Sequence, residues 1–435
     1  MTIRCLLPRR GLGLALGMWS QPQIIGPKSL LQRIALSHVL LLTLRLAAAS
    51  AAAGLAEPEP RRNWSFGEVQ FSNDFPSGRL ADCRKIGPGE FLAVVTPENR
   101  PINQSPWYAF KTWSKQRQSI LICLTNTYSS QRGHPWLSRD GVKWERVSES
   151  AYAHLGTSRV ATVRLEIGPR PVWLATQELV GLRELGEWMD RKSRLPFVTA
   201  EVIGRSIEER VLRQFVIRET TKPNYVVIIG RQHPPEVTGS LGLMSFVDTL
   251  AARTRLARQY RREFQTVVIP LVNPDGVERG HWRSNLGGVD LNRDWRPFSQ
   301  PESRAASAAL LNFARQPGAR PFVFVDFHST STNVFYAQPD SQRIFPPDFT
   351  RAWLAALHRR LPEFGFVRDN GHNAGQFTSK AWANETFGIA SITWEFGYGT
   401  DRQLIRRAAT VGAEEFMRRL LAESSVATPT RKVAR

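Results

Sequence analysis

Four runs of apolar residues, each ending in polar side chains, limit the folds that this chain can adopt. They are residues 225–229 before His233 and Glu236, residues 267–272 before the turn sequence N-P-D-G, residues 321–327 before His328, and residues 390–394 before Glu395. Short apolar runs bounded by turn residues are typical of buried strands. Because ligands bind beyond the carboxyl ends of the strands in open α/β sheets, we expect these polar side chains to converge in one crevice.

The first pair, His233 and Glu236, has the spacing and chemistry of a metal chelate. Zinc accepts imidazole nitrogen and carboxylate oxygen at about 2 Å, and a catalytic zinc site has three protein ligands and one open position. An H-x-x-E sequence alone is weak evidence, because His and Glu are common at helix starts. A third ligand from elsewhere in the chain is therefore required.

Further motifs follow the pair in a specific order. They are N-P-D-G at 273–276, W-R at 282–283, G-x-D-L-N-R at 288–293, D-F-H-S at 326–329 and T-x-E-F at 393–396. With H-x-x-E, this order resembles the M14 zinc metallocarboxypeptidases, over roughly residues 90 to 420. The short spacing between Arg283 and Asn292 resembles the cytosolic-carboxypeptidase branch, which includes deglutamylating enzymes. The resemblance implies an α/β chain in which a mixed-sheet α/β/α catalytic domain follows a β-sandwich domain.

Carried over residue by residue, the resemblance implies that His233, Glu236 and His328 bind one zinc ion per chain. Glu395 would then be the catalytic carboxylate. This assignment agrees with the chemistry, since zinc acidifies water and polarises a carbonyl oxygen. A carboxylate beside it can take the proton and pass it to the leaving amine.

The same resemblance gives roles to three residues of the W-R and L-N-R motifs. Arg283 would stabilise the developing oxyanion, and Asn292 and Arg293 would hold the terminal carboxylate of the substrate, which the planar fork of an arginine matches. Taken singly, these arginines could equally be surface residues of an arginine-rich chain. Their place in the motif order favours the site.

The window before Glu395 departs from the digestive members of the family, which have a tyrosine there. Residues 368–388 contain none, and His372 or Phe377 could occupy its space. Lys380 lies near the position that lines the pocket for the last side chain of the substrate. A cation there predicts a preference for C-terminal Glu or Asp, and the alternative is a solvated lysine on a loop.

The chain of 435 residues is long enough for two soluble domains. We expect a leader at 1–60, a β-sandwich at 63–178, the catalytic domain at 179–422 and a loose tail at 423–435. The formal net charge of +20 indicates either an acidic partner or a bias in codon composition. We expect no nucleic-acid partner, because no recognition module accompanies the charge. The β domain could wall the active-site cleft, or it could bind carbohydrate or adhere to a surface.

The apolar stretch at 34–56 has basic residues before it and small residues at its end, as in a secretory signal. It predicts a periplasmic or secreted protein, with a cytoplasmic one as the alternative. Arg45 interrupts the stretch, so we expect no stable membrane anchor. After export Cys83 and Cys123 could form a disulfide, or they could be two buried thiols.

These features predict a zinc-dependent carboxypeptidase that removes residues from the C-termini of peptides or proteins. One alternative is a zinc amidase or deacylase acting on a small or cell-wall peptide substrate. Another is a non-catalytic binding protein on the same fold. Retention of both Asn292 and Arg293 favours the carboxypeptidase over the amidase, and intact Glu395 and Arg283 disfavour the binding protein.

Overall fold

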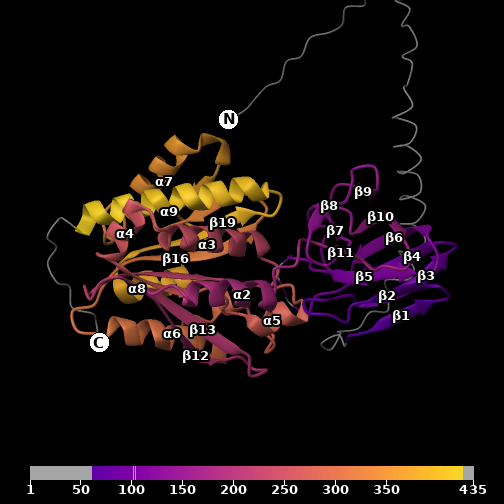
Figure 1. The fold of residues 1–435 in the computed structure, drawn as a ribbon, viewed down its shortest axis with the longest axis horizontal. Coiled ribbons are helices and arrows are strands. Elements are labelled where there is room, and N and C mark those ends of the chain that lie inside the picture. The colour runs from indigo at the N-terminus through magenta and orange to yellow at the C-terminus, as the bar shows by residue number, and fades with distance from the viewer. Residues whose placement is uncertain (1–60, 101, 103, 425–435) are drawn as a thin grey trace, which may run out of the picture.

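The computed structural model describes residues 61–100, 102 and 104–424. The described chain forms two lobes that lie side by side, an N-terminal lobe of strands and a larger lobe of a sheet with helices on both faces (Figure 1). The predicted leader at 1–60 lies outside the described residues, as does the predicted loose tail at 423–435 except for its first two residues. Glu423 and Ser424 are not loose but form the end of a helix, α9 (Arg402–Ser424). In the described ranges, no helix is long and apolar enough to cross a membrane.

Two sheets make up the N-terminal lobe. One has the strand order β1-β2-β5-β11-β7-β8, and the other has the order β3-β4-β6-β10-β9. The first consists of β1 (Asn63–Phe66), β2 (Val69–Ser72), β5 (Ala109–Ser114), β11 (Val172–Ala175), β7 (Trp136–Ser138) and β8 (Trp144–Arg146). The second consists of β3 (Asp82–Gly87), β4 (Glu90–Val95), β6 (Gln118–Asn126), β10 (Val160–Ile167) and β9 (Tyr152–His154).

The two sheets pack face to face through large side chains. The ring of Phe71 in β2 of the first sheet lies 5.0 Å from the ring of Phe91 in β4 of the second sheet, centroid to centroid. Along β10 the buried positions alternate with more exposed ones, as expected for a strand with one face on the core. A D-G sequence at 140–141 lies in the turn that joins β7 to β8, and Gly141 has a φ of 73° there, which favours glycine.

The larger lobe is built on one mixed sheet with the order β12-β13-β15-β14-β16-β19-β17-β18. Its strands are β12 (Val198–Arg205), β13 (Val211–Ile217), β14 (Asn224–Gly230), β15 (Gln265–Ile269), β16 (Arg320–Thr330), β17 (Val334–Tyr336), β18 (Val367–Asp369) and β19 (Ala390–Gly397). The central neighbours β15, β14, β16 and β19 run parallel. Every residue of β14 is buried, which explains its continuous apolar sequence.

Helices cover both faces of this sheet. In Figure 1, α3 (Val237–Leu250), α4 (Arg255–Arg261), α7 (Phe349–Arg360) and α9 (Arg402–Ser424) lie above it, and α6 (Pro301–Ala314) and α8 (Ser379–Phe387) lie below it. Near the N-terminal lobe are α2 (Leu182–Ser193) and α5 (Pro274–Arg279). Two short 3-10 turns are η2 (Leu291–Arg293) and η3 (Pro362–Phe364).

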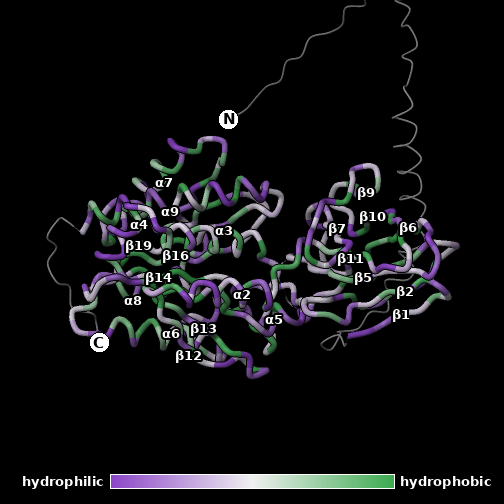
Figure 2. The backbone as a smooth tube through the Cα atoms, viewed as in Figure 1, coloured by the Kyte–Doolittle hydropathy of each residue, from purple (hydrophilic) through white to green (hydrophobic). Residues whose placement is uncertain are grey.

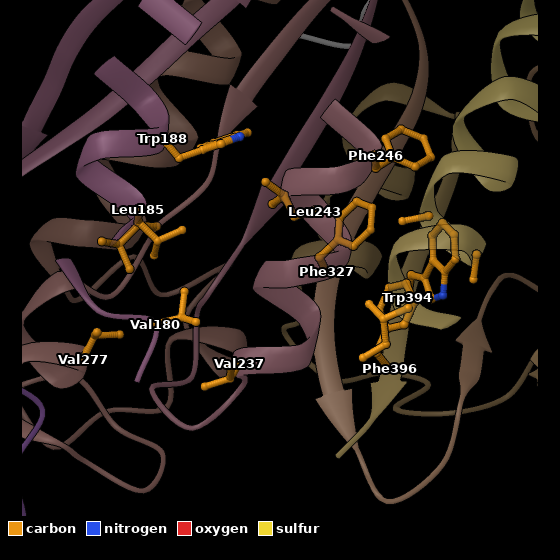
Figure 3. Close-up of a cluster of buried hydrophobic side chains, with 14 of the residues drawn as sticks. Val180, Leu185, Trp188, Val237, Leu243, Phe246, Val277, Phe327, Trp394 and Phe396 are labelled. Carbon is orange, nitrogen blue, oxygen red and sulfur yellow. The ribbon is translucent and has the colours of Figure 1, made fainter. Parts of the chain in front are cut away.

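The core between the sheet and the upper helices is rich in aromatic rings. Leu243 and Phe246 of α3 lie over Phe327 of β16 and over Trp394 and Phe396 of β19 (Figure 3). The Phe246 and Trp394 rings meet edge to face with centroids 6.0 Å apart, an arrangement that the ring quadrupoles favour. Figure 2 shows hydrophobic stretches along the central strands and more hydrophilic ones on the outer helices.

The structure differs from the sequence-based expectations in two places. The N-P-D-G sequence, expected as a turn, instead begins α5, because the Asn273 side chain caps the backbone N–H of Gly276 at 2.9 Å and Pro274 follows it. Helix α8 was not expected; Thr378 caps it by accepting from the Ala381 N–H at 3.2 Å.

Cys83 and Cys123 are both free and buried. They lie on β3 and β6, and β4 separates these strands in the sheet. The two buried thiols, rather than the disulfide, are therefore the arrangement that the structure contains.

Candidate metal centre and active site

The four chelating and acidic residues expected at the strand ends lie together at one edge of the large sheet. His233 lies three residues after the end of β14, and Glu236 is the N-cap residue of α3. His328 and Glu395 are register partners on the adjacent parallel strands β16 and β19. Parallel strands place their carboxyl ends at the same edge, which is why residues so far apart in sequence converge.

His233, Glu236 and His328 offer one ligand atom each within 4.8 Å of one another, and all three are buried. The Nδ1 atom of His233 lies 2.7 Å from Glu236 Oε1, and the Nδ1 atom of His328 lies 2.8 Å from Glu236 Oε2. The two Nδ1 atoms are 3.2 Å apart. This set of two imidazoles and one carboxylate is the ligand type of hydrolytic zinc sites.

The other nitrogen of each imidazole contacts a carboxylate. His233 Nε2 lies 2.9 Å from Asp290 Oδ1, and His328 Nε2 lies 2.7 Å from Asp326 Oδ2. Such contacts fix the ring orientation and the tautomer of a metal-binding histidine. Asp290 and Asp326 therefore orient the histidines, and neither lies in the cavity lining.

The buried carboxylate oxygens of the described chain that lack a well-directed hydrogen bond include two that belong to cavity-lining residues, Oε2 of Glu236 and Oε2 of Glu395. An unpaired buried carboxylate oxygen is costly, and a cation between the histidines would remove that cost. Burial raises the pKa of Glu236, but His233 and His328 outweigh it, so that this pKa is low and the carboxylate is ionised. The residues thus fit a divalent zinc ion.

The pKa of Glu395 shifts in the opposite direction to that of Glu236. Burial raises its pKa to about 7, although His328, His233 and Arg283 oppose the shift. A carboxyl group with a pKa near neutrality is suited to take up a proton and give it back. A dication bound nearby favours the ionised form.

Arg283 is held by carboxylates at both its backbone and its side chain. Its Nε donates to Asp290 Oδ2 at 2.9 Å. Its backbone N–H donates to Glu98 Oε1 at 2.9 Å, that of Ser284 to the same oxygen at 2.6 Å, and that of Trp282 to Glu98 Oε2 at 2.7 Å. Glu98 belongs to the N-terminal lobe, so this lobe fixes the loop that carries Arg283.

Asn292 and Arg293 lie on η2 at the wall of the same cavity. The Oδ1 atom of Asn292 accepts from the backbone N–H of Ser379 at 3.0 Å, which leaves its Nδ2 donors for a ligand. Arg293 donates to the carbonyl oxygen of Asn292 at 2.8 Å and to Asn373 Oδ1 at 3.3 Å. The guanidinium of Arg293 makes no ion pair with a described residue.

Lys380 does not lie on a solvated loop. It is in the first turn of α8 and only 7% exposed. Its Nζ donates to the carbonyl oxygen of His372 at 3.3 Å and pairs with no carboxylate of the described chain. Burial lowers the pKa of Lys380 to about 8, and Asp369 partly opposes this.

All eight residues that the sequence assigned to the site line one cavity of about 190 Å³. They are His233, Glu236, Arg283, Asn292, Arg293, His328, Lys380 and Glu395. Of the two candidates for the space of the family tyrosine, His372 lines the cavity and stacks on Tyr336, with ring centroids 3.9 Å apart. Phe377 is 40% exposed and does not line it.

Several residues in or behind this cavity were not assigned from the sequence. Among them, Tyr336, Tyr398, Ser105 and Arg132 line it, and Glu98 lies behind Arg283. Of these five, Tyr398 alone had a signal, because it follows Glu395 by three residues. The other four come from β17 or the N-terminal lobe, where no motif marks them.

Comparison with known proteins gives one family match. The zinc carboxypeptidase family model, M14, matches residues 185–397. Cytosolic carboxypeptidase 6 of Caenorhabditis elegans is 22% identical over 325 residues, which are 68% of this chain and 71% of that protein. Cytosolic carboxypeptidase 4 of Mus musculus is 36% identical over 145 residues, which are 32% of this chain and 12% of that protein.

Solved structures have a similar fold. The metallo-carboxypeptidase from Burkholderia cenocepacia has a TM-score of 0.70 at 18% identity, and the match covers 81% of this chain and 99% of that one. The metallo-carboxypeptidase from Pseudomonas aeruginosa in complex with (2-guanidinoethylmercapto)succinic acid has a TM-score of 0.66 at 18% identity, covering 82% and 100%. Both matches extend beyond the catalytic lobe.

The comparisons correct one expectation. The predicted periplasmic or secreted location is wrong, because the matched relatives are named cytosolic carboxypeptidases. The match spans only 32% of the length of cytosolic carboxypeptidase 6 from Mus musculus, so these relatives contain regions that this chain does not match.

Proposed function

Residues 185–397 of the chain belong to the M14 zinc carboxypeptidase family, and from this premise we propose that the protein is a zinc-dependent carboxypeptidase that hydrolyses the last peptide bond of peptides or proteins. One observation carries the proposal. A single cavity is lined by the zinc-ligand set, by Glu395 with its raised pKa, and by the pair of Asn292 and Arg293. The size of this cavity limits entry to the end of a peptide chain.

His233, Glu236 and His328 would hold the zinc ion. The chemistry that zinc supplies when bound is Lewis acidity, which acidifies water and polarises a carbonyl oxygen. Glu395 takes the proton of the attacking water at its carboxylate and then delivers it to the leaving nitrogen. Burial raises the pKa of Glu395 above its ordinary value and a bound zinc ion opposes this shift, so both transfers are accessible at neutral pH.

Arg283 stabilises the oxyanion that forms on the scissile carbonyl. Its hydrogen bonds to the described residues use only Nε and the backbone N–H, so both Nη atoms can donate to the developing charge. Because Asp290 and Glu98 fix the residue beforehand, no reorganisation is needed in the transition state. This preorganisation is the main source of electrostatic catalysis.

Asn292 and Arg293 bind the terminal carboxylate of the substrate. The Nδ2 donors of Asn292 and the guanidinium of Arg293 supply the donors that a free carboxylate requires. An amide or ester in the same place lacks the negative charge. This clamp distinguishes a carboxypeptidase from the alternative amidase, whose substrate needs no free C-terminus.

The test is to incubate the zinc-loaded protein with a mixed peptide library and to read truncated C-termini by mass spectrometry. We expect loss of single C-terminal residues. Copies of the same peptides with amidated C-termini should be cleaved at least 100-fold more slowly, because a charged hydrogen bond of about 3 kcal/mol is lost. Equal cleavage of both sets would instead support the amidase.

We further propose that acidic C-terminal residues are preferred. Lys380 is a buried cation whose hydrogen bond to a carbonyl oxygen is long and which has no ion pair with a described residue. A side-chain carboxylate in the cavity would neutralise it and restore its ordinary pKa. Glu or Asp at the substrate C-terminus provides this group.

Replacing Lys380 by Met should remove the preference. We expect the ratio of kcat/KM for Glu-ending over Phe-ending peptides to fall about 10-fold or more, the value of one charged hydrogen bond. In the unmodified protein the same ratio should fall as the pH rises through about 8, because kcat/KM follows the free enzyme and Lys380 then loses its proton.

Lys192→Met is the matched control for this prediction. Lys192 lies on α2 and pairs with Asp248 at 2.5 Å, outside the cavity. Its replacement should leave the ratio unchanged. If Phe-ending peptides are cleaved best by the unmodified protein, the acidic preference is refuted while the carboxypeptidase activity stands.

We also propose that the domain division at 63–178 and 179–422 is functional. Ser105 and Arg132 belong to the N-terminal lobe and line the catalytic cavity. The N-terminal domain then walls one side of the cleft and restricts it to flexible chain ends. This role requires both domains to be present in an active enzyme.

A further inference from the structure

Arg132 lies where the catalytic cavity opens onto a second hollow of the N-terminal lobe. It lines the catalytic cavity together with Ser105 and Glu395. It also lines an open groove of about 500 Å³, whose other walls are Ile102, Gln104, Pro106, Tyr128 and Ser130. The groove and the cavity therefore meet at one guanidinium group.

The position of Arg132 is fixed by contacts from both lobes. Its Nη1 donates to Ser105 Oγ at 3.1 Å and also to the carbonyl oxygen of Gln104. Its guanidinium lies 4.6 Å from the ring centroid of Tyr398, the third residue after Glu395. A cation over an aromatic face and tied at Nη1 keeps its remaining donors in a set direction.

The charge of Arg132 is not balanced locally. It forms no ion pair with any described residue, and no carboxylate is among the residues that line the groove. A second cation, Arg100, lies 5.0 Å from the ring centroid of Tyr128 on the groove wall. A basic groove free of acidic side chains attracts an acidic ligand.

A peptide whose terminal carboxylate is held by Asn292 and Arg293 must leave the cavity with its upstream residues. The groove beyond Arg132 is an exit that reaches solvent. We infer that Arg132 forms a second substrate subsite, which binds an acidic side chain on the residue just before the one released. The inference rests on the proposed function and adds to it a specificity-determining residue from the N-terminal lobe.

The test compares two peptides that end in the same Glu and differ only in Glu or Gln at the preceding position. In the unmodified protein, the Glu peptide should have a kcat/KM roughly 2- to 5-fold higher, as expected for a partly exposed ion pair. Arg132→Gln should reduce this ratio to about 1. Arg139→Gln, which removes an exposed arginine of the same lobe, should keep the original ratio.

Binding provides a readout that does not need turnover. In a Glu395→Gln background, calorimetry should show the same preference for the Glu peptide and the same loss of it with Arg132→Gln. If Arg132→Gln folds poorly, Arg132→Lys is the variant to compare. It keeps the charge and should retain part of the preference. A ratio near 1 in the unmodified protein, or one that survives Arg132→Gln, overturns the subsite. Cleavage of neither peptide instead overturns the proposed function and the subsite with it.

Discussion

Replacement of Glu395 by Gln should reduce kcat by roughly 10³-fold or more and leave zinc binding intact. Glutamine has the same shape but cannot accept the proton of the attacking water, and general acid–base catalysis is worth about 10²–10⁴-fold. Glu395 is not among the three residues whose ligand atoms converge. The loss should therefore appear in kcat, measured by steady-state kinetics, while metal content by mass spectrometry stays at one ion per chain.

Glu385→Gln is the matched control. Glu385 also lies in the catalytic lobe, on α8, but it is exposed and pairs with Arg296 at 2.6 Å. It should retain full activity, because exposed ion pairs contribute little. A Glu395→Gln protein that holds zinc and keeps more than a tenth of the original kcat contradicts the assigned mechanism.

The pH dependence of the melting temperature can exclude unfolding as the cause of the lost activity in Glu395→Gln. Burial raises the pKa of Glu395 to about 7 in the folded metal-free protein. For a carboxyl group whose pKa rises on folding, the stability given by the neutral form is present below about pH 4 and lost as the pH rises through 7. Metal-free Glu395→Gln should thus melt at an equal or higher temperature than the metal-free original protein at pH 8, and at the same temperature near pH 4.

Residues on buried strands were the part of the site most open to prediction from the sequence. His328 and Glu395 end runs that are mostly apolar, because β16 and β19 are buried along nearly all of their length. Such runs identify the strands without any knowledge of their order, and parallel pairing then brings their ends together. The metal set follows from two motifs whose positions are fixed by the sheet.

Lys380 shows where prediction from the sequence was weaker. The nine residues of α8 have no strong apolar periodicity, so the segment resembles a loop until its cap at Thr378 is seen. Burial of the lysine depends on packing against β16 and β19, which no local pattern contains. Tertiary contacts decide such short amphipathic segments.

The individual residues that the N-terminal lobe contributes could not be predicted. Arg132 and Glu98 lie in loops of that lobe and reach a site built from residues 233 to 395, far away in the sequence. The sequence contains neither the angle between the lobes nor the loop conformations. Only the suggestion that the β domain walls the cleft anticipated their place.

Removal of the Glu98 carboxylate should lower both stability and turnover, because it is the sole acceptor from the described chain for three consecutive backbone N–H groups. Leaving a buried donor unsatisfied costs about 1–3 kcal/mol. In Glu98→Gln, one amide oxygen can still serve Arg283 and Ser284, but the NH₂ group faces the N–H of Trp282. We therefore expect a loss of about 1–3 kcal/mol for Gln and more for Ala, measured by denaturant unfolding.

The catalytic effect of the same change separates a positioning role from a purely structural one. If the loop no longer fixes Arg283, kcat should fall by up to about 100-fold, since one oxyanion donor is worth about 10²–10³-fold. KM for a Glu-ending peptide should change little, because Asn292, Arg293 and Lys380 do not contact Glu98. Zinc content should also be unchanged.

Glu278→Gln provides the control at the same junction between the lobes. Glu278, in α5, pairs with the partly exposed Arg61 at 2.6 Å and does not touch the arginine loop. We expect its replacement to cost less than about 1 kcal/mol and to leave kcat unchanged. Equal kcat in Glu98→Gln and the original protein would show that Arg283 keeps its position without Glu98. A loss of kcat confined to Glu98 variants would instead make the N-terminal lobe a part of the catalytic machinery. The Glu98 carboxylate would then fix the backbone from which Arg283, the oxyanion donor, extends.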